Sequence, residues 1–299
     1  MVTPPNSQSS TARVAVVTVS YGSEAVLGPF LSSLASAAAV PLRVIVADNK
    51  SVNISNAVEA LTTDAGAQYL PMASNRGYGH AINEAVKTLP PEIEWVVISN
   101  PDVTFQERAI DNLVARGDSD PRIGSVGPAI LTAEGQVYPS ARAIPSLRNG
   151  IGHALLAGFW RGNPWSAAYR NDDADPSRRR KEVGWLSGAC LLVRRAAFDH
   201  IGGFDAEFFM YFEDVDLGYR LGKIGFTNVY EPAAVVTHTG AHSTSTEPGS
   251  MLSAHHESAK RFLAKKYSSP LLWPVRVILS AGLTARSWIL ERKNRKAAK

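Results

Sequence analysis

Short apolar runs rich in β-branched residues alternate with helical patterns through the first half of this 299-residue chain. Runs too short for a helix and apolar throughout are typical of strands buried on both faces. Their alternation with helical segments predicts an α/β fold, in which helices flank a mostly parallel sheet. The predicted strands cover residues 14–20, 42–48, 68–72 and 95–99, and the predicted helices cover 24–39, 53–63, 78–88 and 106–117.

The second half alternates less regularly. Residues 123–131, 183–195 and 229–238 predict further strands, and residues 205–222 predict a helix. Residues 161–182 are rich in Asn, Asp, Pro and Arg, which is typical of a loop and makes this segment a candidate lid.

Size and charge divide the chain into three parts. With 45% hydrophobic residues it can bury a substantial core, which we expect over residues 13–253, after a disordered tail at 1–12. Residues 260–299 carry 11 Lys or Arg against one acid, a net charge of +10, whereas the remainder carries 20 bases and 26 acids, a net charge of −6. Residues 254–299 are therefore expected to form basic, amphipathic helices.

The basic C-terminal segment predicts an anionic partner. Because its basic residues alternate with Leu, Ile, Val and Trp, a membrane surface is favoured and a nucleic acid is not. From Trp273 to Arg295 one helical face is polar and the opposite face is apolar, which fits an interfacial helix. The alternative is that this face packs on its own domain or on a second subunit of a homo-oligomer.

The cysteine content bears on the compartment. Cys190 is the single cysteine, so no intrachain disulfide can form, and residues 1–12 lack the apolar core of a secretion signal. We expect a cytoplasmic protein that lies peripherally on the inner face of the cell membrane.

Polar residues follow three predicted strands, at the edge where parallel sheets bind ligands. They are Ser20 and Tyr21, then Asp48, then Asn100 and Asp102. Asp102 and the Asn100 amide offer oxygen ligands suited to magnesium or manganese, although an Asn-Pro-Asp sequence is also common in turns. Asp48 could accept a hydrogen bond from a ribose hydroxyl or a base N–H, or it could cap the next helix.

A glycine-containing loop, residues 75–83, leads into a helix. Its backbone N–H groups could face a phosphate, with Arg76 adding charge beside Gly77, and a plain turn is the alternative. Farther along, His238 ends an apolar strand. It could ligate a metal, or it could be a hydrogen-bonded core histidine.

Three acids, Glu213, Asp214 and Asp216, follow a run of five aromatic residues between Phe204 and Phe212. Apolar surroundings and neighbouring acids raise the pKa of a carboxyl group, so this cluster is a candidate general base. The alternative is an exposed helix surface on which these acids pair with Arg220.

Six motifs in order resemble those of the family 2 glycosyltransferases, over residues 13–245. They lie at residues 16–21, 48–51, 75–79, 100–102, 185–189 and 212–217. Within that family the chain is most similar to actinobacterial rhamnosyltransferases that act on N-acetylglucosaminyl-diphospho-polyprenol in cell-wall synthesis. The resemblance implies a GT-A fold, a dTDP-L-rhamnose donor, a divalent metal ion, magnesium or manganese, and inversion at the anomeric carbon.

The same resemblance implies a role for individual residues. Asp214 would be the catalytic base, Asp102 and His238 would bind the metal, and Asn100 departs from relatives that carry a second acid there. The donor would contact Ser20, Tyr21, Asp48, Arg76, Gly77 and Asp102. The acceptor would contact Trp185, Ser187, Gly188 and Glu213.

Three other functions compete with this one. A galactofuranosyl or hexosaminyl transferase would use a UDP-sugar on the same fold. A sugar-phosphate nucleotidyltransferase would need a basic, Gly-rich loop after the first strand, where this chain has residues 20–24, Ser-Tyr-Gly-Ser-Glu. A membrane-attached sugar-binding scaffold would need no catalytic base.

Overall fold

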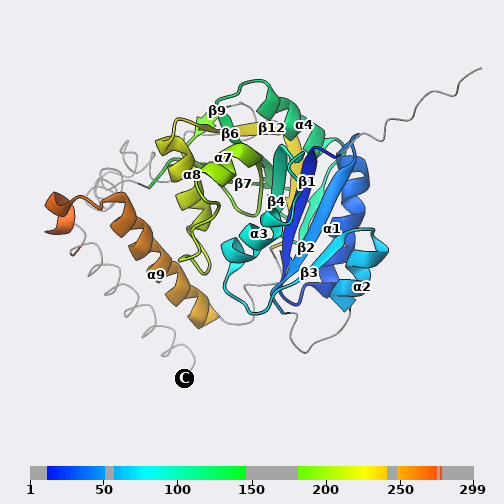
Figure 1. Ribbon diagram of the computed structural model, residues 1–299, viewed down its shortest axis with the longest axis horizontal. Coiled ribbons are helices and arrows are strands. Elements are labelled where there is room, and N and C mark those ends of the chain that lie inside the picture. Colours follow the sequence, from blue (N-terminus) through cyan, green and yellow to red (C-terminus); the bar gives the residue numbers. More distant parts are fainter. Residues whose placement is uncertain (1–11, 51–56, 146–180, 241–247, 275–276, 278–299) are drawn as a thin grey trace, which may run out of the picture.

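The computed structural model describes residues 12–50, 57–145, 181–240, 248–274 and 277, which form a twisted sheet with helices on both faces (Figure 1). Some predictions therefore lie outside the described residues. These are the N-terminal tail before residue 12, nearly all of the candidate lid at 161–182, the start of the helix expected at 53, and most of the helix expected from Trp273 to Arg295.

The elements follow the predicted alternation closely in the first half. They run β1 (Val14–Ser20), α1 (Glu24–Ala37), β2 (Leu42–Asp48), α2 (Ala57–Asp64), β3 (Gln68–Pro71), α3 (Tyr78–Lys87), β4 (Trp95–Ser99), β5 (Val103–Phe105) and α4 (Ala109–Asp118). The second half contains β6 (Ile123–Leu131), β7 (Val137–Tyr138), β8 (Ala141–Arg142), β9 (Lys181–Val183), β10 (Trp185–Leu186), β11 (Cys190–Arg194), α7 (Arg195–His200), α8 (Glu213–Lys223), β12 (Thr227–His238), α9 (Pro248–Lys266) and the 3-10 turn η1 (Pro270–Leu272).

The main sheet has the strand order β3-β2-β1-β4-β11-β6-β12-β5. Strands β3, β2, β1 and β4 are parallel, as are β6 and β12, whereas β11 runs antiparallel between β4 and β6. Ser20 pairs with Asp48 in the β1–β2 register, so the polar residues at the ends of these two strands lie side by side. The expected α/β architecture is confirmed, with β11 as an antiparallel insertion.

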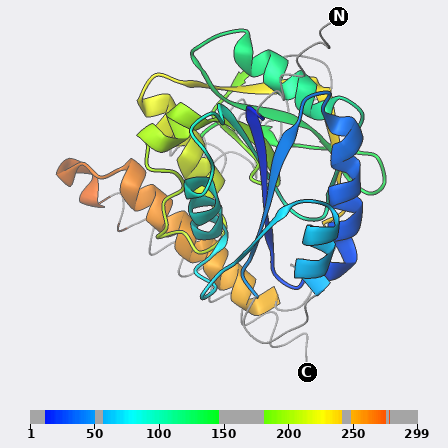
Figure 2. The same ribbon diagram turned by 45° about the vertical axis from the view of Figure 1, so that its right-hand side comes forward.

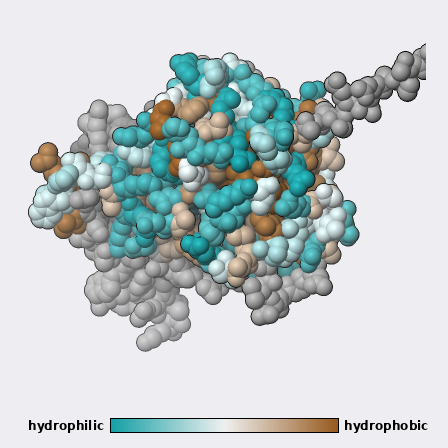
Figure 3. Space-filling view, viewed as in Figure 1, coloured by the Kyte–Doolittle hydropathy of each residue, from teal (hydrophilic) through white to brown (hydrophobic). Residues whose placement is uncertain are grey.

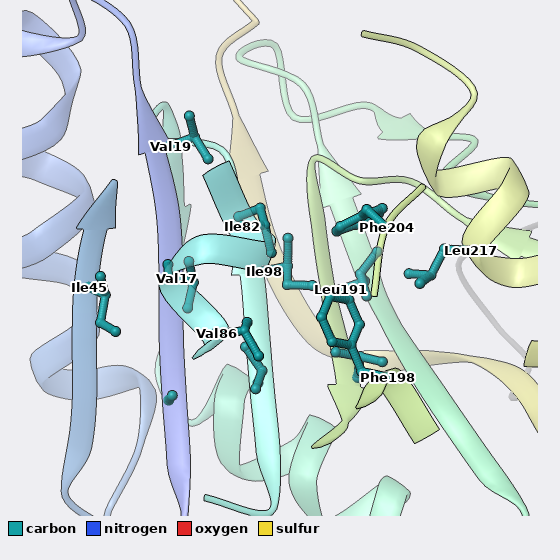
Figure 4. Close-up of a cluster of buried hydrophobic side chains, with 14 of the residues drawn as sticks. Val17, Val19, Ile45, Ile82, Val86, Ile98, Leu191, Phe198, Phe204 and Leu217 are labelled. Atoms are coloured by element: carbon teal, nitrogen blue, oxygen red, sulfur yellow. The ribbon is translucent and has the colours of Figure 1, made fainter. Parts of the chain in front are cut away.

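Strand β1 shows how the sheet divides the core, because its residues alternate between two apolar clusters. Val14 and Val16 pack with α1 and α4, whereas Ala15 and Val17 pack with α3, α7 and α8. Figure 4 shows the second cluster, in which residues of α3, α7 and α8 meet the sheet. Burial on both faces explains why β1 is apolar throughout.

Two predicted boundaries were wrong, for reasons of backbone geometry. The strand predicted at 183–195 is three short strands, β9, β10 and β11, interrupted at Gly184 and by a turn at Ser187 and Gly188. The helix predicted at 205–222 begins only at Glu213, because Tyr211 and Phe212 have φ values of 68° and 64° and cannot continue a right-handed helix.

Helix α9 lies along α8 in both ribbon views (Figures 1 and 2). Its Phe262 is fully buried with Phe208 and Val215. Lys265 of α9 forms ion pairs of 2.7 Å with both Asp205 and Asp216. No helix within the described residues is long and apolar enough to cross a membrane.

Candidate functional site

The ends of β1 and β2 form one side of the site. Asp48 is buried, and its two carboxylate oxygens accept hydrogen bonds from the Lys50 N–H at 3.1 Å and from the Tyr69 hydroxyl at 3.0 Å. The Ser20 hydroxyl is also buried, and no described residue bonds to it. Tyr21 is 59% exposed at the rim. The structure therefore brings Ser20, Tyr21 and Asp48 to the same edge of the sheet.

The second group of polar residues lies at the end of β4, where Asp102 meets His238. Oδ1 of Asp102 is 3.1 Å from Nε2 of His238, and the Asn100 amide nitrogen is 3.3 Å from the same ring nitrogen. Burial raises the pKa of Asp102, but the hydrogen bond and charge of His238 outweigh this and hold the pKa below its usual value. Asp102 is thus a carboxylate at neutral pH.

Backbone pairing fixes this contact between residues 136 positions apart. Strand β5 runs antiparallel to the end of β12, where His238 pairs with Val103. The Thr239 N–H donates to the Asp102 carbonyl oxygen at 3.2 Å. His238 is therefore held against Asp102 by the sheet itself.

Asp102 and His238 supply part of the ligand set that a divalent metal ion needs. Asp102 offers carboxylate oxygens and His238 an imidazole nitrogen, both of which bind manganese and magnesium. Within the part of the chain that the structure describes, no group of three or more His, Cys, Asp or Glu side chains could hold a metal. The remaining ligands of an ion here would have to come from the substrate or water.

The acids of α8 form the third group. The peptide N–H of Gly188 donates to Oδ2 of Asp214 at 2.9 Å, and the Val215 N–H donates to Oδ1 at 2.8 Å. Glu213 is only 8% exposed, and its Oε2 atom bonds to no described residue. The predicted alternative, exposed acids paired with Arg220, is wrong for Glu213 and Asp214. Arg220 pairs with Asp216 instead, and Asp216 is fully buried.

The two neighbouring acids differ in proton affinity. Burial and the adjacent Asp214 charge raise the pKa of Glu213 to about 8. Burial also raises the pKa of Asp214, but the N–H groups of Gly188 and Val215 and the charge of Arg142 oppose that rise. Glu213 therefore keeps its proton at neutral pH, and Asp214 is the acid of the pair that ionises first.

Tyr78 lies between the groups. Its hydroxyl donates to the Gly188 carbonyl oxygen at 3.0 Å. Burial raises the pKa of Tyr78 most, and the negative charges of Glu213, Asp214 and Asp102 raise it further. All three acids are therefore within electrostatic range of one phenol, which places the predicted base and the predicted metal ligand at one site.

The loop before α3 connects the two sides. Gly77 has a φ of 99°, and a Cβ there would lie 2.2 Å from the Phe209 carbonyl oxygen. The Gly77 N–H donates to Asn75 and the Tyr78 N–H donates to Phe209. These two N–H groups thus bond within the protein rather than facing a phosphate. Arg76 is exposed, and its contact with the donor stays a prediction.

Of the predicted acceptor residues, Trp185 lies on the small sheet of β8 and β10, Ser187 and Gly188 lie in the turn that follows β10, and Glu213 precedes Asp214 on α8. Trp185 pairs with Arg142 across this sheet, and its indole N–H donates to the Ala143 carbonyl oxygen at 3.1 Å. The Ser187 hydroxyl accepts from the Ala189 N–H at 3.3 Å, so it shapes the turn that presents Gly188.

Sequence reasoning missed two residues of the site. Tyr78 had a weak signal, since it stands between two glycines at a predicted helix start. Arg142 had none, because its closeness to Asp214 arises only from strand pairing between β8 and β10.

Comparison with known proteins adds three findings. The family profile described as "Glycosyltransferase like family 2" matches residues 12–256. The N-acetylglucosaminyl-diphospho-decaprenol L-rhamnosyltransferase of Mycobacterium tuberculosis (strain H37Rv) is 44% identical over 288 residues, which are 93% of each chain. Rhamnosyltransferase WbbL of Escherichia coli K12 is 26% identical over 259 residues, 85% of this chain and 93% of WbbL.

A solved structure is similar in fold. The mannosyltransferase PcManGT from Pyrobaculum calidifontis, in complex with GDP-Man and Mn2+, superposes with a TM-score of 0.58 at 16% identity. The match covers 96% of this chain and 80% of that one. The GT-A fold expected from the sequence is confirmed.

Proposed function

Because this chain belongs to the family 2 glycosyltransferases, we propose that it transfers L-rhamnose from dTDP-L-rhamnose to N-acetylglucosaminyl-diphospho-polyprenol, with inversion at the anomeric carbon. The name of the mycobacterial relative, 44% identical over nearly the whole chain, supports the acceptor and the sugar. The observation that carries the chemistry is the backbone connection between the proposed base and the proposed metal ligands: Asp214 accepts from the Gly188 N–H, Ala189 accepts from the Asn100 N–H, and Asp102 contacts His238.

Asp214 is the proposed general base. It removes the proton from an acceptor hydroxyl, the freed oxygen forms a bond to the anomeric carbon, and the bond from that carbon to the diphosphate breaks to release dTDP. The backbone donors at Gly188 and Val215 hold the carboxylate in place for this step. A positioned general base contributes about 10²- to 10⁴-fold to the rate.

Asp102 and His238 are the proposed protein ligands of a magnesium or manganese ion. When bound, such an ion neutralises charge on the departing diphosphate. Mn2+ in the complex of the structurally similar mannosyltransferase supports a divalent ion. The low pKa of Asp102 also supports this role, because a ligand carboxyl must be ionised.

The donor nucleotide is proposed to bind at the ends of β1 and β2. Ser20 and Asp48 are adjacent there, and the Ser20 hydroxyl has no bond to any described group. Tyr21 and Arg76 complete the proposed donor site, and Gly77, whose N–H bonds to Asn75, shapes the loop that carries Arg76. Trp185, Ser187, Gly188 and Glu213 border the proposed acceptor site.

A location on the cytoplasmic face of the membrane is proposed for the enzyme, with residues 254–299 as its basic appendage. Leu271, Trp273 and Val277, which follow α9, are 89%, 59% and 54% exposed. Figure 3 shows hydrophobic atoms at the end of the molecule where Figure 1 draws η1. Apolar side chains beside a basic segment suit an anionic lipid surface.

The test combines a nucleotide-sugar panel with a base variant. Purified protein should rhamnosylate a short-chain N-acetylglucosaminyl-diphospho-lipid with dTDP-L-rhamnose and a divalent metal. Asp214→Asn should lower turnover by about 10²- to 10⁴-fold and leave donor affinity unchanged. Asp199→Asn, at an exposed acid of α7 that pairs with Arg195, is the control and should behave as wild type.

Two of the rival functions have their own outcomes in this assay. Transfer from a UDP-sugar alone would indicate a galactofuranosyl or hexosaminyl transferase. Binding without transfer by any donor would indicate a sugar-binding scaffold. Full turnover by Asp214→Asn would remove the base assignment while leaving the enzyme's activity intact.

A further inference from the structure

The Arg142 side chain is held by three contacts near the proposed acceptor site, and the proposed reaction gives it no role. Its guanidinium carbon lies 5.6 Å from the ring centre of Tyr138 and 5.6 Å from that of Trp185. Its Nε donates to the Pro139 carbonyl oxygen at 2.8 Å. Two aromatic contacts and one backbone bond fix the orientation of this side chain.

The outer nitrogens of Arg142 are the available part of the group. Among the described residues, the hydrogen-bond partner of this guanidinium is the Pro139 carbonyl oxygen, which Nε contacts, and neither terminal nitrogen bonds to a described group. A guanidinium that is oriented through Nε and still offers both terminal nitrogens matches the geometry of a phosphate or carboxylate.

The place of Arg142 in the fold connects it to the reacting acceptor. Strand pairing sets Arg142 opposite Trp185, one of the predicted acceptor residues. The Ser187 N–H donates to the Ser140 carbonyl oxygen at 2.8 Å, so the chain just before Arg142 lies against the turn whose Gly188 N–H donates to Asp214. If the reacting hydroxyl of the acceptor sugar lies at Asp214, the diphosphate attached to the same sugar would therefore lie near Arg142.

We propose that Arg142 binds the diphosphate of the lipid-linked acceptor, while Trp185 borders the acceptor sugar. This inference rests on the proposed function, because it takes the acceptor to be a sugar diphosphate. The donor diphosphate is a less suitable occupant, since the proposed ligands of its metal ion, Asp102 and His238, lie in the turn after β4 and at the end of β12 rather than on the β8–β10 sheet. Arg142 thus selects acceptors that carry an anionic group next to the sugar.

The test compares two acceptors by calorimetric titration into enzyme saturated with dTDP, which blocks the donor site. One is an N-acetylglucosaminyl-diphospho-alkyl compound, and the other is the neutral alkyl N-acetylglucosaminide with the same chain. Arg142→Met should weaken binding of the first about 10- to 100-fold and leave the second unchanged. Arg142→Lys should fall between, because lysine keeps the charge and loses the two-nitrogen geometry.

Arg122→Met is the matched control, since Arg122 pairs with Asp120 at the surface. Equal affinity of wild type and Arg142→Met for the diphosphate compound would overturn the inference, as would equal weakening of both compounds. A change confined to the pH dependence of turnover would also overturn it, because Arg142 would then act only through its charge on the pKa of Asp214. Wild-type enzyme that binds neither compound would instead contradict the proposed acceptor.

Discussion

The peptide N–H of Gly188 donates to Oδ2 of Asp214 at 2.9 Å, and this bond connects the proposed base to the edge of the sheet that carries the proposed metal ligands. The next residue, Ala189, accepts from the Asn100 N–H at 2.9 Å, and Asn100 begins the turn that contains Asp102. A short series of backbone bonds thus joins two carboxylates that are 112 positions apart in the chain. The relative placement of the proposed base and the proposed metal ligand is set by backbone bonds.

Gly77 should tolerate no side chain. In Gly77→Ala the new Cβ would lie 2.2 Å from the Phe209 carbonyl oxygen at a φ of 99°, so we expect the free energy of unfolding to fall by about 3–5 kcal/mol. Gly66→Ala is the control, because Gly66 has a φ of 69° with no atom within 4 Å, and it should cost about 1–2 kcal/mol. Urea denaturation measures the free energy of unfolding of both variants. Similar decreases would mean that the backbone at Phe209 shifts to accommodate the new Cβ and that the prediction is wrong.

Glu213 should make the protein less stable as the pH rises. Its folded pKa of about 8 exceeds the ordinary value of 4.5, so between these values the native state holds more protons than the unfolded state. The linkage relation then gives a free energy of unfolding that decreases across this window, by up to about 1.4 kcal/mol per pH unit.

Glu213→Gln should remove this decrease and be more stable than wild type at pH 9. Denaturation midpoints measured from pH 5 to 9 test it, with Glu92→Gln as the control because Glu92 is an exposed acid. Parallel pH profiles for wild type and Glu213→Gln would show that Glu213 is ionised in the folded protein.

Asp102 and His238 should govern metal affinity as well as activity. Asp102→Asn and His238→Ala each remove one proposed ligand, and we expect Mn2+ affinity in the presence of dTDP to fall about 10- to 100-fold. Electron paramagnetic resonance of free Mn2+ measures this without turnover. Asp120→Asn changes a surface carboxylate that pairs with Arg122 and should have no effect. Unchanged Mn2+ binding by Asp102→Asn would place the metal elsewhere.

Lys265 should stabilise the packing of α9 against the first turn of α8. Its ammonium group lies 2.7 Å from both Asp205 and the fully buried Asp216, so Lys265→Met should lower the free energy of unfolding by about 1–3 kcal/mol. Lys260→Met, which removes only a 4.0 Å pair with Glu257, should cost less than about 0.5 kcal/mol. Thermal unfolding of the full chain compares them, and equal midpoints would mean that Lys265 adds nothing to the docking of α9.

The apolar end after α9 should bind lipid. Replacing Leu271 and Trp273 by Ser removes two exposed apolar side chains, and partitioning onto vesicles with anionic lipid should fall at least about 10-fold. Ile224→Ser, at a residue 40% exposed on another part of the surface, should leave partitioning unchanged. Activity on a short soluble acceptor should persist in both. Equal partitioning of the double variant and wild type would favour a protein partner for this end.

Sequence patterns predicted the parallel half of the fold well because each element there has a local cause. Strand β1 is buried on both faces and is therefore apolar at every position, and its predicted and observed bounds agree. The start of the helix that carries the acidic cluster was harder to predict, because no local sequence signal indicates a left-handed backbone at Tyr211 and Phe212. Helix α9 supports that conformation, because the Ser258 hydroxyl donates to the Met210 carbonyl oxygen and the His255 ring makes edge-to-face contacts with both aromatic rings.

The sequence by itself determined the α/β class, the placement of Asp48 and Asp102 at strand ends, and the acidic cluster at 213–216. These follow from residue periodicity and local composition, which act over a few neighbouring positions. Only the tertiary structure decided that Asp214 faces Gly188, that His238 meets Asp102, and that Arg142 lies near the base. Those contacts join distant segments through strand pairing and backbone hydrogen bonds, and such pairing is selected by the packing of the whole sheet.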